Sequence, residues 1–224
     1  MDRRTFIRST GAAAAIGATA GCLDTVGLGG NSDVTLREPD RPFESEDVPY
    51  PAWGQQVADV TLPAPLAGGS LALQDPGKPT LLTFFYSHCQ TVCPVLISTL
   101  RNVQAHAQSN DYAGEVAFAP VTFDPARDTA DRLESYGEKM NVTTAEDGWQ
   151  FLRPESESRA KTVVQEAFGV DFRRTEPEDM EMYMFAHTSL TLLVNADGYV
   201  ERAYQTSSPN QQTIIEDLTT LREA

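Results

Sequence analysis

Residues 84–94 read FFYSHCQTVCP, and this stretch decides the fold that we predict. It places Cys89 and Cys93 four positions apart, directly after an apolar run and immediately before Pro94. Such a run is typical of a buried strand, and the residues after Pro94 have the periodicity of a helix. Two of the chain's three cysteines therefore lie at one strand-to-helix junction. Three kinds of site are open here: a structural disulfide, a redox dithiol or part of a metal site.

The pattern on either side of this junction predicts alternating strands and helices in one domain. Beyond a hairpin over 57–73 that is broken at 68–69, we expect strands over 80–86, 116–123, 149–152, 185–194 and 199–204. We expect helices that begin near residue 94, at 128 or 129, at 156 or 158, and near 209. Asn-Ala-Asp-Gly at 195–198 predicts a tight turn between the last two strands. This is the order of a thioredoxin-like α/β fold, a central mixed sheet flanked by helices, with an N-terminal hairpin extension.

The first 22 residues have the pattern of an export signal. Arg3 and Arg4 precede a mild apolar stretch over 11–21, which is too short to cross a bilayer of about 30 Å. The letters RRTFI resemble a twin-arginine signal, and Thr-Ala-Gly-Cys at 19–22 resembles a lipobox. We therefore expect lipid on Cys22 and a protein held at the extracytoplasmic face of the cell membrane.

Residues 23–56 are rich in Gly, Asp, Glu, Ser and Pro and have no sustained period. This composition predicts a flexible tether between the signal and the thioredoxin-like domain over 57–224. An alternative is that residues 48–56, with Trp53, lie against the domain.

The charge balance excludes some partners. The chain has 32 acidic residues against 17 Lys plus Arg, a net charge of −15, so we expect it to repel nucleic acid and anionic lipid headgroups. Its only lysines are Lys78, Lys139 and Lys161. Excess carboxylate with scarce lysine resembles proteins of extreme halophiles, and an ordinarily acidic protein is the alternative.

The position and spacing of the cysteines favour activated sulfur. The amide groups and dipole at a helix N-terminus favour an anion, so Cys89 is expected to form a thiolate readily. Cβ atoms at i and i+4 of a helix lie about 5 to 6 Å apart, whereas a disulfide needs about 3.8 Å. Two sulfurs at that separation can reach one soft metal ion. A flexible loop before Pro94 would still allow oxidation, so the spacing leaves both readings open.

The available ligands favour copper over zinc. A structural zinc site needs four ligands, whereas Cu(I) accepts few ligands and favours thiolate, and imidazole suits both copper states. Of the three histidines, His88 adjoins Cys89 but is expected to point away, and His106 is expected on a helix surface. His187 precedes a strong apolar strand, at the loop where thioredoxin-like oxidoreductases carry a cis-proline that faces their cysteines.

Three blocks of sequence resemble the SCO/SenC family, the copper-binding thioredoxin-like proteins of cytochrome c oxidase assembly. They are residues 84–94, the stretch VTFDPARDT at 121–129, and His187-Thr188 with the turn at 197–198. The blocks occur in the family's order, and the likeness covers residues 57–223. Each block alone is weak, and together they are specific.

The resemblance implies a copper site of Cys89, Cys93 and His187, holding Cu(I), Cu(II) or both. It implies a membrane-tethered metallochaperone that takes copper from an upstream donor and delivers it to the CuA centre of an oxidase subunit. The alternative is a thiol-disulfide reductase that keeps the CuA cysteines reduced, with Cys89 attacking and Cys93 resolving. The chain departs from the family at Ala186, where an Asp is usual, and at Gln90, where a Pro is usual.

Two further groups have competing interpretations. Asp124–Thr129 either contacts a partner or simply forms a turn and a helix cap, with Arg127 pairing locally. Met180, Met182 and Met184 alternate, so on a strand their thioethers would share one face. They are either a transient Cu(I) relay or ordinary packing residues.

Overall fold

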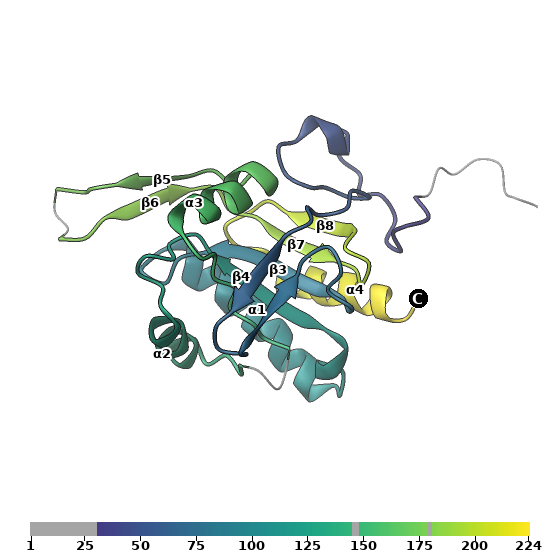
Figure 1. Ribbon diagram of the computed structural model, residues 1–224. Coiled ribbons are helices and arrows are strands. Elements are labelled where there is room, and N and C mark those ends of the chain that lie inside the picture. The colour runs from purple at the N-terminus through teal and green to yellow at the C-terminus, as the bar shows by residue number, and fades with distance from the viewer. Residues whose placement is uncertain (1–30, 145–147, 179–180) are drawn as a thin grey trace, which may run out of the picture.

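The computed structural model describes residues 31–144, 148–178 and 181–224 (Figure 1). Its elements in chain order are η1 (Ser45–Asp47), β1 (Thr61–Ala64), β2 (Gly69–Ala72), β3 (Thr80–Phe85), α1 (Val92–Ser109), η2 (Ala113–Glu115), β4 (Ala117–Thr122), α2 (Ala130–Met140), α3 (Glu157–Ala160), the π-helix η3 (Lys161–Ala167), β5 (Phe172–Thr175), β6 (Met184–His187), β7 (Thr191–Val194), β8 (Val200–Tyr204) and α4 (Gln211–Arg222). The signal expected at 1–22, with Cys22, lies outside these residues.

A four-stranded mixed sheet in the order β4-β3-β7-β8 forms the centre of the molecule. β3 runs parallel to β4 and antiparallel to β7, and all six of its residues are buried. A strand that is covered on both faces reads as a continuous apolar run, which is why 80–86 is recognisable in the sequence. The one hydroxyl buried at its middle, on Thr83, donates to the carbonyl of Leu190, so this polar group keeps a partner.

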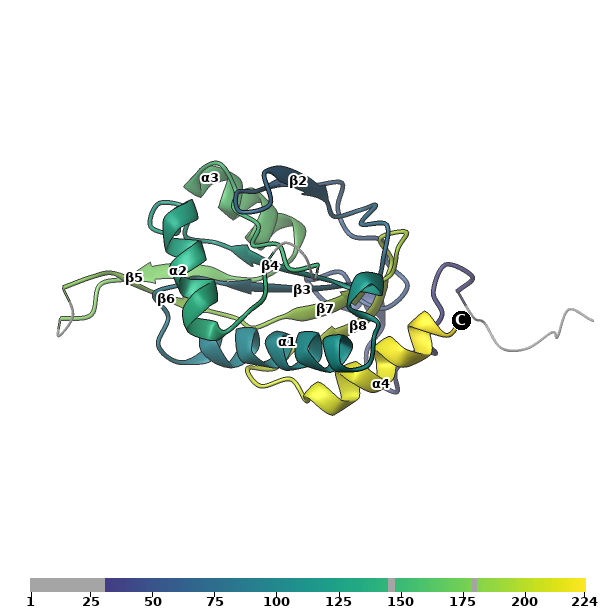
Figure 2. The same ribbon diagram turned by 90° about the horizontal axis from the view of Figure 1, so that it is seen from below.

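Helices cover the sheet as the order of elements predicts. α1 and α4 lie on one face, and α3 lies on the other with the β1–β2 hairpin (Figure 2). Leu96, Leu100 and Val103 of α1 are fully buried, so the face expected from their spacing is the one that meets the sheet. Across the described ranges, no helix is long and apolar enough to cross a bilayer.

The single strand expected over 185–194 is wrong. Residues 184–187 form β6, which pairs antiparallel with β5 in a separate two-stranded sheet, and only 191–194 join the central sheet as β7. The β5–β6 hairpin projects from one end of the body (Figures 1 and 2). Residues 188–190 separate the two strands, so the chain changes sheets directly after His187.

Of the two caps expected for α2, Asp128 or Thr129, the structure has Thr129, whose hydroxyl accepts from the amide of Arg132. One local expectation differs from the structure. The strand expected over 149–152 is reduced to two isolated bridges beside β4.

Residues 31–56 pack on the domain. Leu36, Tyr50 and Ala52 are buried, and the carboxylate of Glu201, itself fully buried, accepts from the amides of Thr35 and Leu36. This packing differs from the flexible tether expected over 23–56 and agrees with the alternative that 48–56 lie against the domain. Glu201 lies 166 residues after Thr35 and 165 after Leu36, so the local composition of 23–56 cannot reveal this contact.

Candidate metal centre

Both cysteines sit where β3 passes into α1. The amide of Cys89 donates to the carbonyl of Tyr86 at 3.2 Å, which closes a turn after the strand. Cys93 lies in the first turn of α1, and its amide donates to the sulfur of Cys89 at 3.4 Å. Both thiols are free and buried. A helix N-terminal amide that points at a sulfur stabilises the thiolate form.

His187 ends β6 and faces the cysteines from the opposite side. Its Nε2 lies 3.6 Å from the sulfur of Cys93, and its Nδ1 lies 3.0 Å from the carbonyl of Thr188. A carbonyl can only accept, so Nδ1 carries the hydrogen and Nε2 has its lone pair free toward the sulfurs. The Thr188 carbonyl thus orients the ring, and Ala186 beside it has no side chain that could do so.

The three side chains fit one ion. The sulfurs of Cys89 and Cys93 and a ring nitrogen of His187 all lie within 4.8 Å of one another. Ligands that one ion holds at about 2.0 to 2.3 Å are at most about 4.6 Å apart, so small side-chain shifts bring all three into coordination. Two thiolates and one imidazole form a soft ligand set with low coordination number, which suits copper.

Aromatic side chains shield the imidazole. Its ring centroid lies 5.1 Å from that of Phe123 and 6.0 Å from that of Tyr86. The hydroxyl of Tyr86 accepts from the amide of Phe185, which ties β6 to the body two residues before His187. The two aromatic rings therefore cover one side of the imidazole.

The two thiols are strongly inequivalent. The hydrogen bond from the Cys93 thiol is the largest cause that lowers the pKa of Cys89; burial opposes it, and the His187 ring, in its protonated form, lowers it further. Burial raises the pKa of Cys93, and its bond to Cys89 raises it further. Burial lowers the pKa of His187, but Cys89 and the Thr188 carbonyl outweigh burial, so the net shift is upward. A metal ion at this site must displace the shared protons.

A buried carboxylate holds the turn before Cys89. Asp128 accepts from the hydroxyl of Ser87 at 2.5 Å, from its amide at 3.0 Å and from the hydroxyl of Thr122. Arg132 donates to the hydroxyl and the carbonyl of the same serine at 2.7 and 2.8 Å. Burial raises the pKa of Asp128, and the bonds from Ser87 and Thr122 act in the opposite direction. The sequence predicted a cap here and missed this network.

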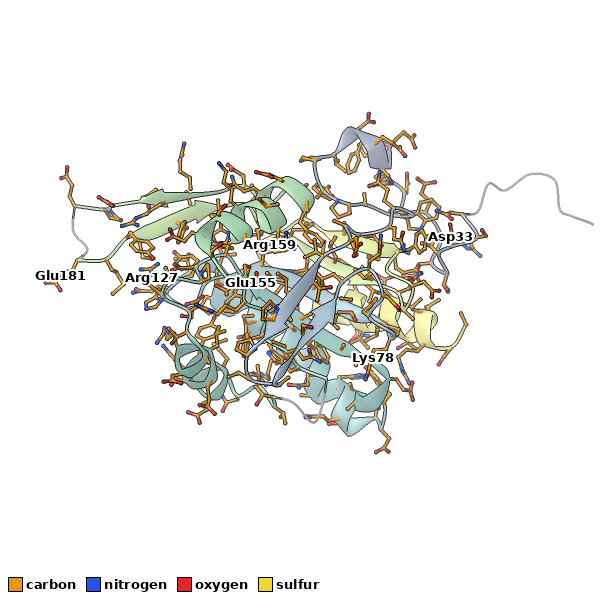
Figure 3. All side chains as sticks on the ribbon, viewed as in Figure 1. Asp33, Lys78, Arg127, Glu155, Arg159 and Glu181 are labelled. Atoms are coloured by element: carbon orange, nitrogen blue, oxygen red, sulfur yellow. The ribbon has the colours of Figure 1, made fainter. Side chains whose placement is uncertain are left out.

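A second cluster holds the hairpin that carries His187. Arg127 stacks on the ring of Tyr183 at 3.5 Å, and Arg174 stacks on it at 3.7 Å. Arg127 also donates to Asp124 at 2.6 Å and to the Tyr183 carbonyl at 2.8 Å, and the Tyr183 hydroxyl donates to Asp124 at 2.8 Å. Arg127 lies at the base of the projecting hairpin (Figure 3). The local pairing expected for Arg127 is present, and the aromatic stacking was not expected.

The other candidate ligands lie apart from the sulfurs. Nδ1 of His88 faces Ser87 and Asp128, at 3.3 Å from the hydroxyl and 3.7 Å from the carboxylate. Nδ1 of His106 lies 2.6 Å from the hydroxyl of Tyr112. Both histidines therefore have other partners.

The alternating methionines do not share one strand. Met184 is half-buried in β6, Met182 is exposed in the bend before it, and Met180 lies outside the described residues.

The mixed sheet, the flanking helices and the cysteine pair at the first strand-to-helix junction define a thioredoxin-like protein with a thiolate–imidazole site. Residues 73–223 match the family model described as SCO1/SenC. The chain belongs to the SCO1/SenC family.

Curated relatives are distant. The chain is 25% identical over 128 residues to the "SCO1 protein homolog" of Bacillus subtilis, which covers 57% of this chain and 62% of that protein. It is 25% identical over 137 residues to a "SCO2-like protein" of Rickettsia conorii, covering 60% and 62%. The match thus spans less than two thirds of these relatives.

Solved structures share the fold. Bradyrhizobium japonicum ScoI, solved with copper bound, superposes with a TM-score of 0.60 at 22% identity, covering 75% of this chain and 99% of that one. Arabidopsis thaliana ScoI, also with copper bound, gives 0.62 at 20% identity, covering 76% and 100%.

Proposed function

We propose that the chain binds copper through Cys89, Cys93 and His187 and delivers it during assembly of a cytochrome c oxidase. The observation that carries this proposal is the convergence of two free thiols and a lone-pair-bearing imidazole nitrogen within 4.8 Å. Solved relatives described as holding copper support the choice of ion. A solved relative is described as a member of "the Sco family of cytochrome c oxidase assembly proteins", which supports the process.

The geometry also suggests how copper leaves. Cys93 is fully buried, whereas Cys89 is 6% exposed and His187 is half-buried at the base of the projecting hairpin. An incoming thiolate from a CuA-bearing subunit can therefore reach the ion from the side of His187 and Cys89. Cys93 is then the last of the three ligands to dissociate from the ion. Stepwise replacement of ligands lets the ion move without being released to water.

The test is copper stoichiometry and X-ray absorption on the reduced protein beside His187→Ala, with His106→Ala as the matched control. We expect one copper with two sulfurs and one nitrogen, and loss of that nitrogen only in His187→Ala. Affinity should fall by about 100-fold or more in that variant, because the loss of a residue that only supports a ligand already costs about 10- to 100-fold. Absence of copper from the wild type would overturn the proposal.

A thiol-disulfide reductase that acts on CuA cysteines is the second candidate. The observation that favours it is the inequivalence of the thiols: Cys89 has a lowered pKa and Cys93 a raised one, the pattern of an attacking thiolate with its resolving partner. Reduction of an oxidised CuA peptide should then survive His187→Ala, whereas copper delivery should not. Loss of both activities in that variant would count against the reductase.

The site of action that we propose is the extracytoplasmic face of the membrane, with the chain held by lipid on Cys22. The support is the sequence pattern at 1–22. Cell fractionation of the wild type and of Cys22→Ser tests this, because the variant should leave the membrane fraction. Equal membrane retention of both would contradict it.

A further inference from the structure

A pocket of about 350 Å³ lies next to the metal centre, against the base of the β5–β6 hairpin. Its apolar wall is formed by Phe123, Phe172 and Phe185. Phe123 stacks on Phe172 at 4.8 Å and also packs on the ring of His187, so one aromatic ring separates the pocket from the imidazole. The volume is near the lower end of the roughly 300–1,000 Å³ range of ligand sites, which is room for one large side chain and its neighbours.

The rim of the pocket is cationic in a chain of net charge −15. Lys161, Arg173 and Arg174 line it, against the single carboxylate of Glu157. Arg174 pairs with Glu176 at 3.3 Å, but within the described part of the chain neither Lys161 nor Arg173 has an ion-pair partner. Both side chains are exposed, so the rim offers two unpaired cations beside an apolar wall. Arginine and aromatic side chains are enriched at protein interfaces.

The element that carries Lys161 is also uncommon. Residues 161–167 form a π-helix, in which the amide of Phe168 donates to the carbonyl of Val163. Short π-helical segments are rare and frequently lie at functional sites. Here the segment turns Lys161 and Gln165 toward the pocket.

We infer that this pocket docks the copper acceptor, through an acidic segment of that protein that carries one aromatic or large aliphatic side chain. The inference rests on the proposed copper delivery. The apolar side chain enters the pocket against Phe172 and Phe185, and the acidic residues meet Lys161 and Arg173. A partner seated there is one aromatic ring away from His187, the side from which the ion can be reached.

The test measures binding of a copper-free soluble CuA domain to the wild type and to two kinds of variant. Lys161→Glu/Arg173→Glu reverses the unpaired rim charges, and Gln165→Trp fills the pocket without changing charge. Arg37→Glu/Lys139→Glu is the matched control, since both residues are exposed and carry the same charge change away from the pocket. Copper affinity is measured in every variant to report an intact site.

We expect the rim variant and the pocket-filling variant each to weaken binding by about tenfold or more and to slow copper transfer, with copper affinity unchanged. The control should stay within about twofold. Equal binding by the rim variant and the control, together with normal binding by Gln165→Trp, would overturn the docking site and leave copper delivery intact. Binding that depends on the pocket without copper transfer would instead remove the proposed function and keep the docking site. No binding by the wild type would overturn the docking site directly.

Discussion

The two sides of the metal centre are built differently. Cys89 and Cys93 sit on the β3–α1 junction inside the core, where the strand before them is wholly buried. His187 sits at the base of a two-stranded hairpin whose residues are half-buried or exposed and which projects from the body (Figure 2). Elements with few buried contacts open more readily than core strands. The thiolates are therefore the fixed half of the site, and the imidazole is the adjustable half.

The largest effect is expected from removing a thiol of the fixed half. Cys93→Ala should abolish retained copper, because it removes one of the two thiolates, the donors that Cu(I) favours. Copper remaining after dialysis against a chelator measures this, with Ser98→Ala on the same helix as control. Retention at the wild-type level would show that Cys93 is not a ligand.

Loosening the fixed half without touching a ligand should have the next largest effect. In Asp128→Asn an amide NH₂ replaces an oxygen that accepts from Ser87 or Thr122, so at least one buried donor loses its partner. We expect the free energy of unfolding to fall by about 1 to 3 kcal/mol and copper affinity to fall with it.

Urea unfolding and copper competition measure the two effects of Asp128→Asn. Asp131→Asn, an exposed neighbour with the same charge change, should stay within about 0.5 kcal/mol of the wild type. An equal response of both variants would refute a positioning role for the buried carboxylate.

Loosening the β5–β6 hairpin, the adjustable half, should lower copper affinity by less. Tyr183→Ala removes the ring between Arg127 and Arg174 and the hydroxyl bonded to Asp124. Each cation–π contact contributes about 0.5 to 1 kcal/mol at an exposed site, so copper affinity should fall severalfold. Amide exchange in β5 and β6 should speed up, while exchange in β3 stays unchanged. Tyr183→Phe keeps the stacking, so its copper affinity should lie between those of the wild type and Tyr183→Ala. Unaltered exchange in Tyr183→Ala would show that Tyr183 does not hold the hairpin.

The smallest expected effect is a difference between Cys89 and Cys93 in how their alkylation rates depend on pH. Because the pKa of Cys89 is lowered, its thiolate persists as the pH falls through the usual thiol range, whereas Cys93, whose pKa is raised, stays protonated. In the copper-free protein, alkylation of Cys89 should change little between about pH 8 and 6, where a free thiol slows steeply. Mass spectrometry of each cysteine peptide measures this. A tenfold slowing at Cys89 would contradict the lowered pKa.

The fixed half was also the predictable half. The run before Cys89 and the period after Pro94 are local signals, and the main sheet and its helices follow from signals of the same kind. His187 was singled out from three histidines by its place before an apolar strand and by resemblance to the family. The β5–β6 hairpin was missed because its strands are four residues each, half-exposed, and separated by a long acidic stretch with no turn signature.

Contacts between distant residues account for the rest. Asp128 reads as a helix cap, since nothing in its neighbourhood shows that Ser87, 41 residues earlier, would occupy its carboxylate. The packing of 31–56 depends on Glu201, whose carboxylate meets amides 165 and 166 residues away. Patterns within a window report periodicity and caps, but not which buried charge finds which distant amide.

The buried Glu201 also determines at which end of the domain the N-terminal segment enters. By holding Thr35 and Leu36, it fixes the point where the chain enters the domain. Asp33, near that point, lies at the opposite end of the molecule from Glu181 near the hairpin tip (Figure 3). An anchor upstream of residue 31, as proposed for Cys22, would therefore attach at the end of the domain that lies away from the hairpin tip (Figure 3). A copper acceptor could then approach the hairpin end of the domain while the opposite end stays anchored, and the domain would not need to reorient.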